Sequence, residues 1–232
     1  MSRDARALLL DLDDTLYPLR GFRLSGFRAV ALHLAGSHGV DADRAYGVLM
    51  RASRESARRT ALQICLARFG VSAAIVPDLV EMMRSHRPSI RLPGETRGVL
   101  TRLKVGWRLG IVTNGRPDLQ ARKIEALGLH ALVDTIVLAQ EHTRQGKPDR
   151  TPFAVALRSL GVAASRAVFV GDDDRCDLFG ASRLGMKTVF CGRYKSGTFE
   201  EPRYADAEVA TLAALPAVAE ALLQQRRSRR AA

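Results

Sequence analysis

Short apolar runs recur along the chain, and most of them end in acidic or small polar residues. Each run has the length of a buried strand, and helical stretches such as Pro117–Leu127 and Thr151–Leu160 lie between them. Strands that alternate with helices predict an α/β fold with a parallel sheet and right-handed crossovers. The five candidate strands are Ala5–Asp11, Val105–Asn114, Leu132–Ala139, Ala167–Gly171 and Met186–Cys191.

The segment from Tyr17 to Leu92 breaks this rhythm. It is rich in Arg and Ala, and it shows helical periodicity over Phe27–Ala35, Arg44–Arg68 and Ile75–Ser85. We interpret it as an all-α module inserted after the first strand. The expected domains are a core of residues 1–16 and 93–222, an insert of residues 17–92, and a basic, flexible tail of residues 223–232.

Composition narrows the class of protein. The chain has 232 residues, of which 47% are hydrophobic and 26% charged, as in a globular chain rather than a disordered one. No apolar run approaches the roughly 18 residues of a membrane span. Three scattered cysteines, Cys65, Cys176 and Cys191, form no CxxC pair, which favours a reducing, cytoplasmic compartment.

The net charge of +12 suits nucleic acid, an anionic surface or a negatively charged small substrate as a partner. Residues 16–92 alone contain 12 arginines and no lysine, against 5 acids. No nucleic-acid recognition motif or set of interleaved aromatic residues accompanies this charge. We therefore expect a small anionic substrate, and nucleic-acid binding is the alternative from a different class.

The first apolar run continues into the sequence DLDDT, residues 11–15. Because residues two apart in a strand point the same way, Asp11 and Asp13 are expected to face one pocket. Two carboxylates this close stay ionised only beside a cation, and Mg²⁺ prefers oxygen ligands. Asp14 is better explained as a turn former or a helix cap.

A second acidic sequence, GDDDRCD at residues 171–177, follows the fourth apolar run. Parallel strands end at a shared edge, so Asp172 and Asp173 are expected to form the other half of a metal site. Asp177 would open the next helix, where a carboxylate is favoured, so a capping role competes with a role in the site.

Two shorter sequences could bind phosphate. Thr113, Asn114 and Gly115 end the second apolar run, and a hydroxyl with backbone N–H groups suits phosphate oxygens, although a plain turn fits equally. Pro148 keeps Lys147 extended. The Lys147 ammonium would offset phosphate and carboxylate charge, although a lone loop lysine is usually only solvated.

In this order the four sequences resemble the motifs of the haloacid dehalogenase superfamily of phosphotransferases. Residues 11–15 resemble its nucleophile motif, Thr113 its second motif, Lys147 its third, and Gly171-Asp172 with Asp177 its fourth. One such motif is weak evidence, but four in order are specific. The resemblance implies a Rossmann-like core, with the insert as a helical C1 cap.

The resemblance also implies a mechanism. Asp11 attacks phosphorus to form an aspartyl-phosphate, while Asp13 protonates the leaving oxygen and then activates water. The phosphoryl oxygens are expected on Thr113, Lys147 and the turn of Asn114 and Gly115.

An implied Mg²⁺ is held by Asp11, the backbone carbonyl of Asp13 and Asp172. Asp173 and Asp177 are expected around these ligands, with Asp177 orienting Lys147 or a metal-bound water. Many relatives carry Ser or Thr where this chain has Asp173, so either Asp172 or Asp173 is open as the ligand.

The reaction expected from this resemblance is Mg-dependent hydrolysis of a small phosphate monoester. The sequence DDTLYP resembles pyrimidine-nucleotidase-like members, which predicts a nucleotide monophosphate, with sugar phosphates and phosphoglycolate as alternatives. Asp13 favours phosphate chemistry, because the family's dehalogenases usually lack an acid there, but a dehalogenase and a phosphomutase remain alternatives. Arg51, Arg54 and Arg58 share a helical face that suits a second anionic group or simple exposure.

Overall fold

A computed structural model describes residues 5–54, 60–194 and 201–231, with the side chains of residue 54 and residues 225–231 excepted. The chain divides into two compact units, residues 1–18 with 91–232, and residues 19–90. The second unit starts two residues later and ends two residues earlier than the insert expected from the sequence. None of the helices in the described residues combines the length and the hydropathy that crossing a bilayer requires.

The first unit contains a parallel six-stranded sheet in the order β3-β2-β1-β4-β5-β6. This confirms the predicted α/β class and overlaps all five predicted strands. The short edge strand β6 was not predicted, because three residues carry too little periodicity. The strands are β1 (Ala7–Leu10), β2 (Arg108–Thr113), β3 (Thr135–Leu138), β4 (Ala167–Gly171), β5 (Lys187–Cys191) and β6 (Ala207–Val209).

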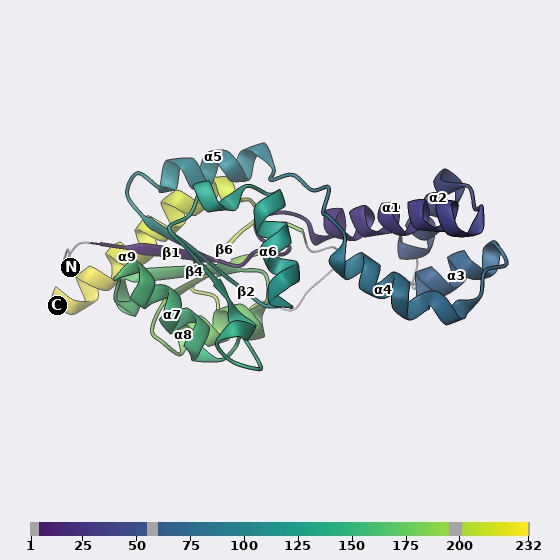
Figure 1. Cartoon of the computed structure of the whole chain (residues 1–232). Coiled ribbons are helices and arrows are strands. Elements are labelled where there is room, and N and C mark those ends of the chain that lie inside the picture. The colour runs from purple at the N-terminus through teal and green to yellow at the C-terminus, as the bar shows by residue number, and fades with distance from the viewer. Residues whose placement is uncertain (1–4, 55–59, 195–200, 232) are drawn as a thin grey trace. The chain divides into compact units, whose positions relative to one another are not determined.

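Strand β1 occupies the middle of the sheet, where Leu10 pairs with Ile111 on one side and Val170 on the other. All four of its residues are apolar and fully buried, as expected for a strand covered on both faces. Figure 1 shows the strands between α5 on one side and α7 and α8 on the other. The residue that follows β1 therefore lies deep in the unit.

Helices of the first unit begin and end at recognisable signals. Pro117 opens α6, and the Asp149 side chain caps α7 by accepting from the Thr151 N–H at 2.7 Å. Gly161 ends α7 with a φ of 62°. The helices are α5 (Gly94–Leu103), α6 (Pro117–Ala126), α7 (Arg150–Leu160), a π-helix (Asp174–Phe179), α8 (Gly180–Ser182) and α9 (Leu215–Ala231).

Helix α9 continues through the residues that the sequence analysis assigns to a flexible tail. Gln and Arg are good helix formers, so the polar end of the chain extends the helix instead of ending it.

The second unit is helical and has its own core. The stretch Arg44–Arg68, predicted as one periodic segment, is helical up to residue 54 in α2 and from residue 61 in α3, and residues 55–59 lie outside the described residues. Leu34, Leu49, Leu66 and Leu79, one from each helix, are almost fully buried. The helices are α1 (Leu19–His38), α2 (Ala42–Arg54), α3 (Ala61–Arg68) and α4 (Val76–Ser85).

Candidate active site

The predicted polar residues meet at the carboxyl edge of the sheet. Asp11 follows β1, Thr113 ends β2, and Asp172 follows β4. Lys147 and Asp177 come to the same place from the loop before α7 and from the π-helix. Residues 136 positions apart in the chain are therefore in direct contact.

Three carboxylates form a cluster at this edge. Oxygen atoms of Asp11, Asp172 and Asp177 all lie within 4.8 Å of one another. Lys147 Nζ forms an ion pair with Asp11, lies 2.6 Å from Asp177 Oδ1, and donates to the Val112 carbonyl at 2.9 Å. Asp11, Asp177 and Lys147 are each at least 94% buried. Two of the three carboxylates are thus buried with the ammonium, while Asp172 is half-buried at the edge of the cluster.

Burial dominates the electrostatics of Asp11 and raises the pKa of its carboxyl, while the Lys147 ammonium partly offsets this effect. Burial alone would lower the pKa of Lys147, but the charges of Asp11 and Asp177 outweigh burial and raise it. Lys147 therefore stays charged at neutral pH.

The donor set of the cluster fits a divalent cation. Carboxylate oxygens are hard ligands of the kind that Mg²⁺ prefers, and three negative charges here face one ammonium. Asp11, Asp172 and Asp177 could hold such an ion. The Asp13 backbone carbonyl, which the sequence analysis adds to the ligands, stays a prediction.

The acidic residues that follow β4 have different contacts. The Asp173 carboxylate accepts from the N–H groups of Arg175 at 2.9 Å and Cys176 at 2.7 Å, so it caps the π-helix. Asp172, and not Asp173, belongs to the carboxylate cluster. Asp177 does not cap this helix, because Asp173 does so. The geometry therefore favours Asp172 as the metal ligand.

Gly171 allows Asp177 to approach the strand end. A Cβ at Gly171 would lie 2.2 Å from Asp177 Oδ2, a distance that real Cβ atoms do not show. A glycine at the end of β4 is thus required for the position of the Asp177 carboxylate.

Asn114 clamps the backbone of Lys147. Its Oδ1 accepts from the Lys147 N–H at 2.7 Å, and its Nδ2 donates to the Lys147 carbonyl at 2.9 Å. Gly146, with a φ of 68°, leaves room for this amide, since a Cβ there would lie 2.4 Å from Asn114 Oδ1. The Gly115 N–H donates to Gln140 Oε1 at 2.8 Å. The Asn114 amide and the Gly115 N–H therefore hold loops, whereas the sequence analysis expects this turn to hold phosphate.

Asp13 lies beside helix α6 and has partners that the sequence analysis did not predict. Lys123 Nζ lies 2.9 Å from Asp13 Oδ1 and 2.8 Å from Oδ2. Gln120 Nε2 donates to Asp13 Oδ2 at 3.0 Å and to Thr113 Oγ1 at 2.6 Å. The Tyr17 hydroxyl donates to Asp13 Oδ1 at 2.6 Å.

The signal for Gln120 and Lys123 was present in the sequence. They are three residues apart on a helix that starts just after the Thr113 strand, so they share a face that looks toward the strand ends. Both are at least 97% buried. Polar residues on a helix usually face water, and only the fold shows that this face is covered.

One family of hydrolases matches most of the chain, and two phosphatases are similar to it in sequence. A family model for haloacid dehalogenase-like hydrolases matches residues 5–185. The chain is 32% identical over 210 residues to the ribulose-1,5-bisphosphate 5-phosphatase of Halopiger xanaduensis, covering 80% of this chain and 84% of that protein. It is 30% identical over 216 residues to the glyceraldehyde 3-phosphate phosphatase of Methanopyrus kandleri, covering 87% and 89%.

Solved structures share the fold over nearly the whole chain. The 2-haloacid dehalogenase of Pseudomonas syringae superposes with a TM-score of 0.62 at 26% identity, over 92% of this chain and 97% of that chain. A phosphatase from Thermococcus onnurineus gives a TM-score of 0.59 at 24% identity over the same shares. The likeness therefore includes the helical insert as well as the sheet.

Proposed function

This chain is a phosphatase of the haloacid dehalogenase-like hydrolase family, and from this premise we propose that it hydrolyses monophosphate esters of small sugars or trioses through an aspartyl-phosphate on Asp11. One observation carries the proposal: Asp11 is buried at the end of the central strand in direct contact with Lys147. A buried carboxylate with a fixed ammonium beside it suits attack on a phosphoryl group, because the ammonium balances charge on both.

The chemistry uses the chain's own groups in two steps. An Asp11 oxygen bonds to phosphorus as the bond from phosphorus to the ester oxygen breaks, and the Asp13 carboxyl gives that oxygen its proton. Asp13, now a carboxylate, takes a proton from water, whose oxygen attacks phosphorus and releases phosphate and Asp11. Lys147 and the Thr113 hydroxyl hold the phosphoryl oxygens through both steps.

The carboxylates of Asp11, Asp172 and Asp177 would hold Mg²⁺ during this reaction. When bound, the ion neutralises charge on the phosphoryl oxygens and lets the Asp11 carboxylate approach them.

The substrate class comes from the similar phosphatases. They are named for ribulose 1,5-bisphosphate and glyceraldehyde 3-phosphate, both phosphorylated carbohydrates. These relatives do not support the nucleotide monophosphate expected from the DDTLYP sequence. That sequence surrounds the nucleophile, where all substrates present the same phosphoryl group, so it carries little information on the rest of the substrate.

Phosphate release tests the proposal. We expect the wild-type protein with Mg²⁺ to act on glyceraldehyde 3-phosphate or ribulose 1,5-bisphosphate with higher kcat/KM than on nucleotide monophosphates. The Asp11→Asn variant should lose at least about 10³-fold in kcat, because an amide cannot replace the nucleophile. Asp78→Asn, an exposed change in α4, is the matched control and should keep full activity.

Two results would contradict the proposal: full wild-type activity in excess chelator, or full activity in Asp11→Asn. Halide release from a 2-haloacid without phosphate release would assign the chain instead to the chemistry named for the Pseudomonas structure.

A further inference from the structure

We propose that Lys123 and Gln120 are positioning residues that fix the Asp13 carboxylate and the Thr113 hydroxyl from helix α6. This inference rests on the proposed function, and it adds two residues that the family's four motifs do not contain.

Lys123 contacts the Asp13 carboxylate directly. Its ammonium reaches both oxygens of Asp13, at 2.9 and 2.8 Å, and its side chain is only 4% exposed. One donor that spans both oxygens fixes the plane of the carboxylate as well as its distance.

Gln120 couples two groups of the site. Its Nε2 donates to Asp13 Oδ2 at 3.0 Å and to Thr113 Oγ1 at 2.6 Å, and the residue is 1% exposed. The Thr113 oxygen accepts from Gln120, and its hydroxyl makes only a long contact, 3.4 Å, as donor to the Asn114 carbonyl, which a phosphoryl oxygen could replace. One amide therefore orients both a proton-transfer group and a phosphate-binding group.

A loss of Asp13 positioning can be told apart from a general loss of protein stability, because it should affect the two chemical steps differently. Nitrophenolate leaves p-nitrophenyl phosphate as an anion without a proton, so formation of the aspartyl-phosphate does not depend on Asp13 as acid. Hydrolysis of the intermediate does depend on Asp13, which must take a proton from the attacking water. Loss of Asp13 positioning should therefore slow the second step and spare the first.

Rapid-mixing kinetics with p-nitrophenyl phosphate and Mg²⁺ test this. Lys123→Met should release the first equivalent of nitrophenolate within about 3-fold of the wild-type rate, and then turn over about 100-fold more slowly. Asp13→Asn should show the same pattern, and adding Lys123→Met to it should cause no further loss. Lys104→Met, an exposed change at the end of α5, is the control and should behave as wild type.

Further variants keep the test decisive if Lys123→Met does not fold. Lys123→Arg should recover part of the second step, and Gln120→Leu should slow it about 10-fold while raising KM through Thr113. Equal slowing of both steps, or no slowing, in folded variants overturns the inference. A wild-type protein that hydrolyses no phosphate ester would instead overturn the proposed function.

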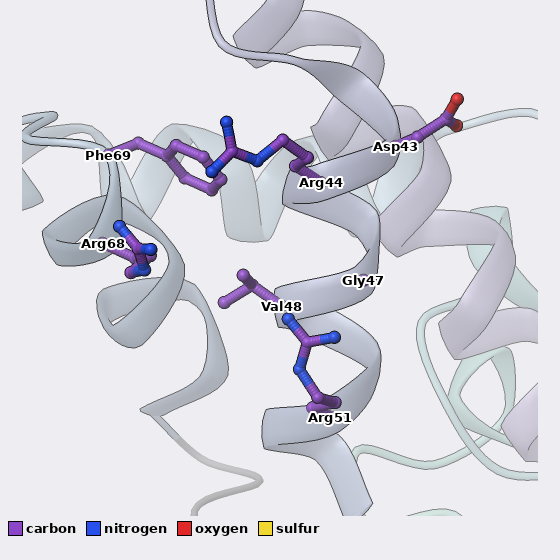
Figure 2. Close-up of a pocket in the computed structure, with 7 residues that line it drawn as sticks. All are labelled: Asp43, Arg44, Gly47, Val48, Arg51, Arg68 and Phe69. Atoms are coloured by element: carbon purple, nitrogen blue, oxygen red, sulfur yellow. The ribbon is translucent and has the colours of Figure 1, made fainter.

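A second observation, independent of the first, lies in the helical unit. A cavity of about 370 Å³ opens between α2 and the end of α3, and Figure 2 shows Val48, Arg44 and Arg68 around it with Phe69. Arg51 lines the lower part of the same cavity. We infer that this cavity binds a small polyanion, a molecule with two or more phosphate or carboxylate groups.

Charge is the basis of this inference. Among the described residues, the structure shows no carboxylate paired with Arg44, Arg51 or Arg68. The one acid in the lining, Asp43, points away in Figure 2 and lies 2.6 Å from Arg28 NH1. Three guanidinium groups around one cavity suit multiply charged anions. Arg51 is also one of the three arginines for which the sequence left a second anionic group and simple exposure as alternatives; residue 58 and the side chain of residue 54 lie outside the described structure.

Calorimetric titration with pyrophosphate and with citrate, without Mg²⁺, tests the cavity. The double variant Arg44→Gln/Arg68→Gln should lose at least about 10-fold in affinity for one of them. The control Arg84→Gln/Arg87→Gln removes the same charge from the end of α4 and the following loop and should keep the affinity. Equal losses in both double variants, or no binding by the wild-type protein, would overturn the inference.

Discussion

At the scale of single residues, the site depends on contacts between side chains that are far apart in the sequence. Asp11, Lys147 and Asp177 are far apart in the chain and form one buried group. Gly171 leaves room for Asp177, and Asn114 clamps the backbone of Lys147. Two of the three charged groups are thus placed by neighbours that carry no charge.

Gly171→Ala should test one such neighbour. The new Cβ would lie 2.2 Å from Asp177 Oδ2, so the carboxylate must move out of the cluster. We expect Mg²⁺ affinity, measured from the metal dependence of phosphate release, to fall about 10- to 100-fold. Gly94→Ala is the control, because a Cβ there meets nothing within 4 Å and should leave the affinity unchanged.

Some residues of the site could be predicted from the sequence, and others could not. The acids after β1 and β4, Thr113 and Lys147 were predictable, because an apolar strand that ends in charge is unusual and the four sequences occur in a known order. Gln120 and Lys123 were not, because a polar residue in an amphipathic helix usually faces water. The cap role of Asp173 was also hidden, since three consecutive acids look alike until the backbone shows which one accepts N–H groups.

At the scale of elements, helix α5 fixes the loop that follows Asp11. The buried Thr96 hydroxyl donates to the Leu16 carbonyl at 3.0 Å, across 80 residues of sequence. The contact joins the end of the first core segment to the start of the second. It therefore stabilises the loop on which Asp13 lies.

Thr96→Val should remove this bond while keeping the volume of the side chain. A buried carbonyl left without its donor costs about 1–3 kcal/mol in the free energy of unfolding, which urea denaturation measures. Thr101→Val is the matched change in the same helix, where the hydroxyl is exposed and bonds the Arg97 carbonyl one turn earlier. Its effect should stay within about 0.5 kcal/mol, and an equal effect of both variants would contradict the role of Thr96.

At the scale of the whole molecule, two units each bury an apolar core of their own. Leu49→Ala, in the core of the helical unit, should cost about 2–5 kcal/mol. Because the sheet has separate packing, faster amide exchange should be confined to residues 19–90, and the amides of β1 should stay protected.

Hydrogen exchange with mass spectrometry measures this distribution. Leu9→Ala, the corresponding change in the sheet, is the converse control and should release the β1 amides. A uniform increase in exchange after Leu49→Ala would show that the two cores unfold as one.

The bond between Thr96 and Leu16 has a consequence for ancestry. It holds the points of departure and return of the inserted helices beside each other on the sheet unit. Because these two ends of the sheet unit are held close together, an insert of another length or fold can join them without displacing the neighbouring strands. We therefore expect related proteins to differ in the insert at this junction while keeping the polar residues at the strand ends in the same positions.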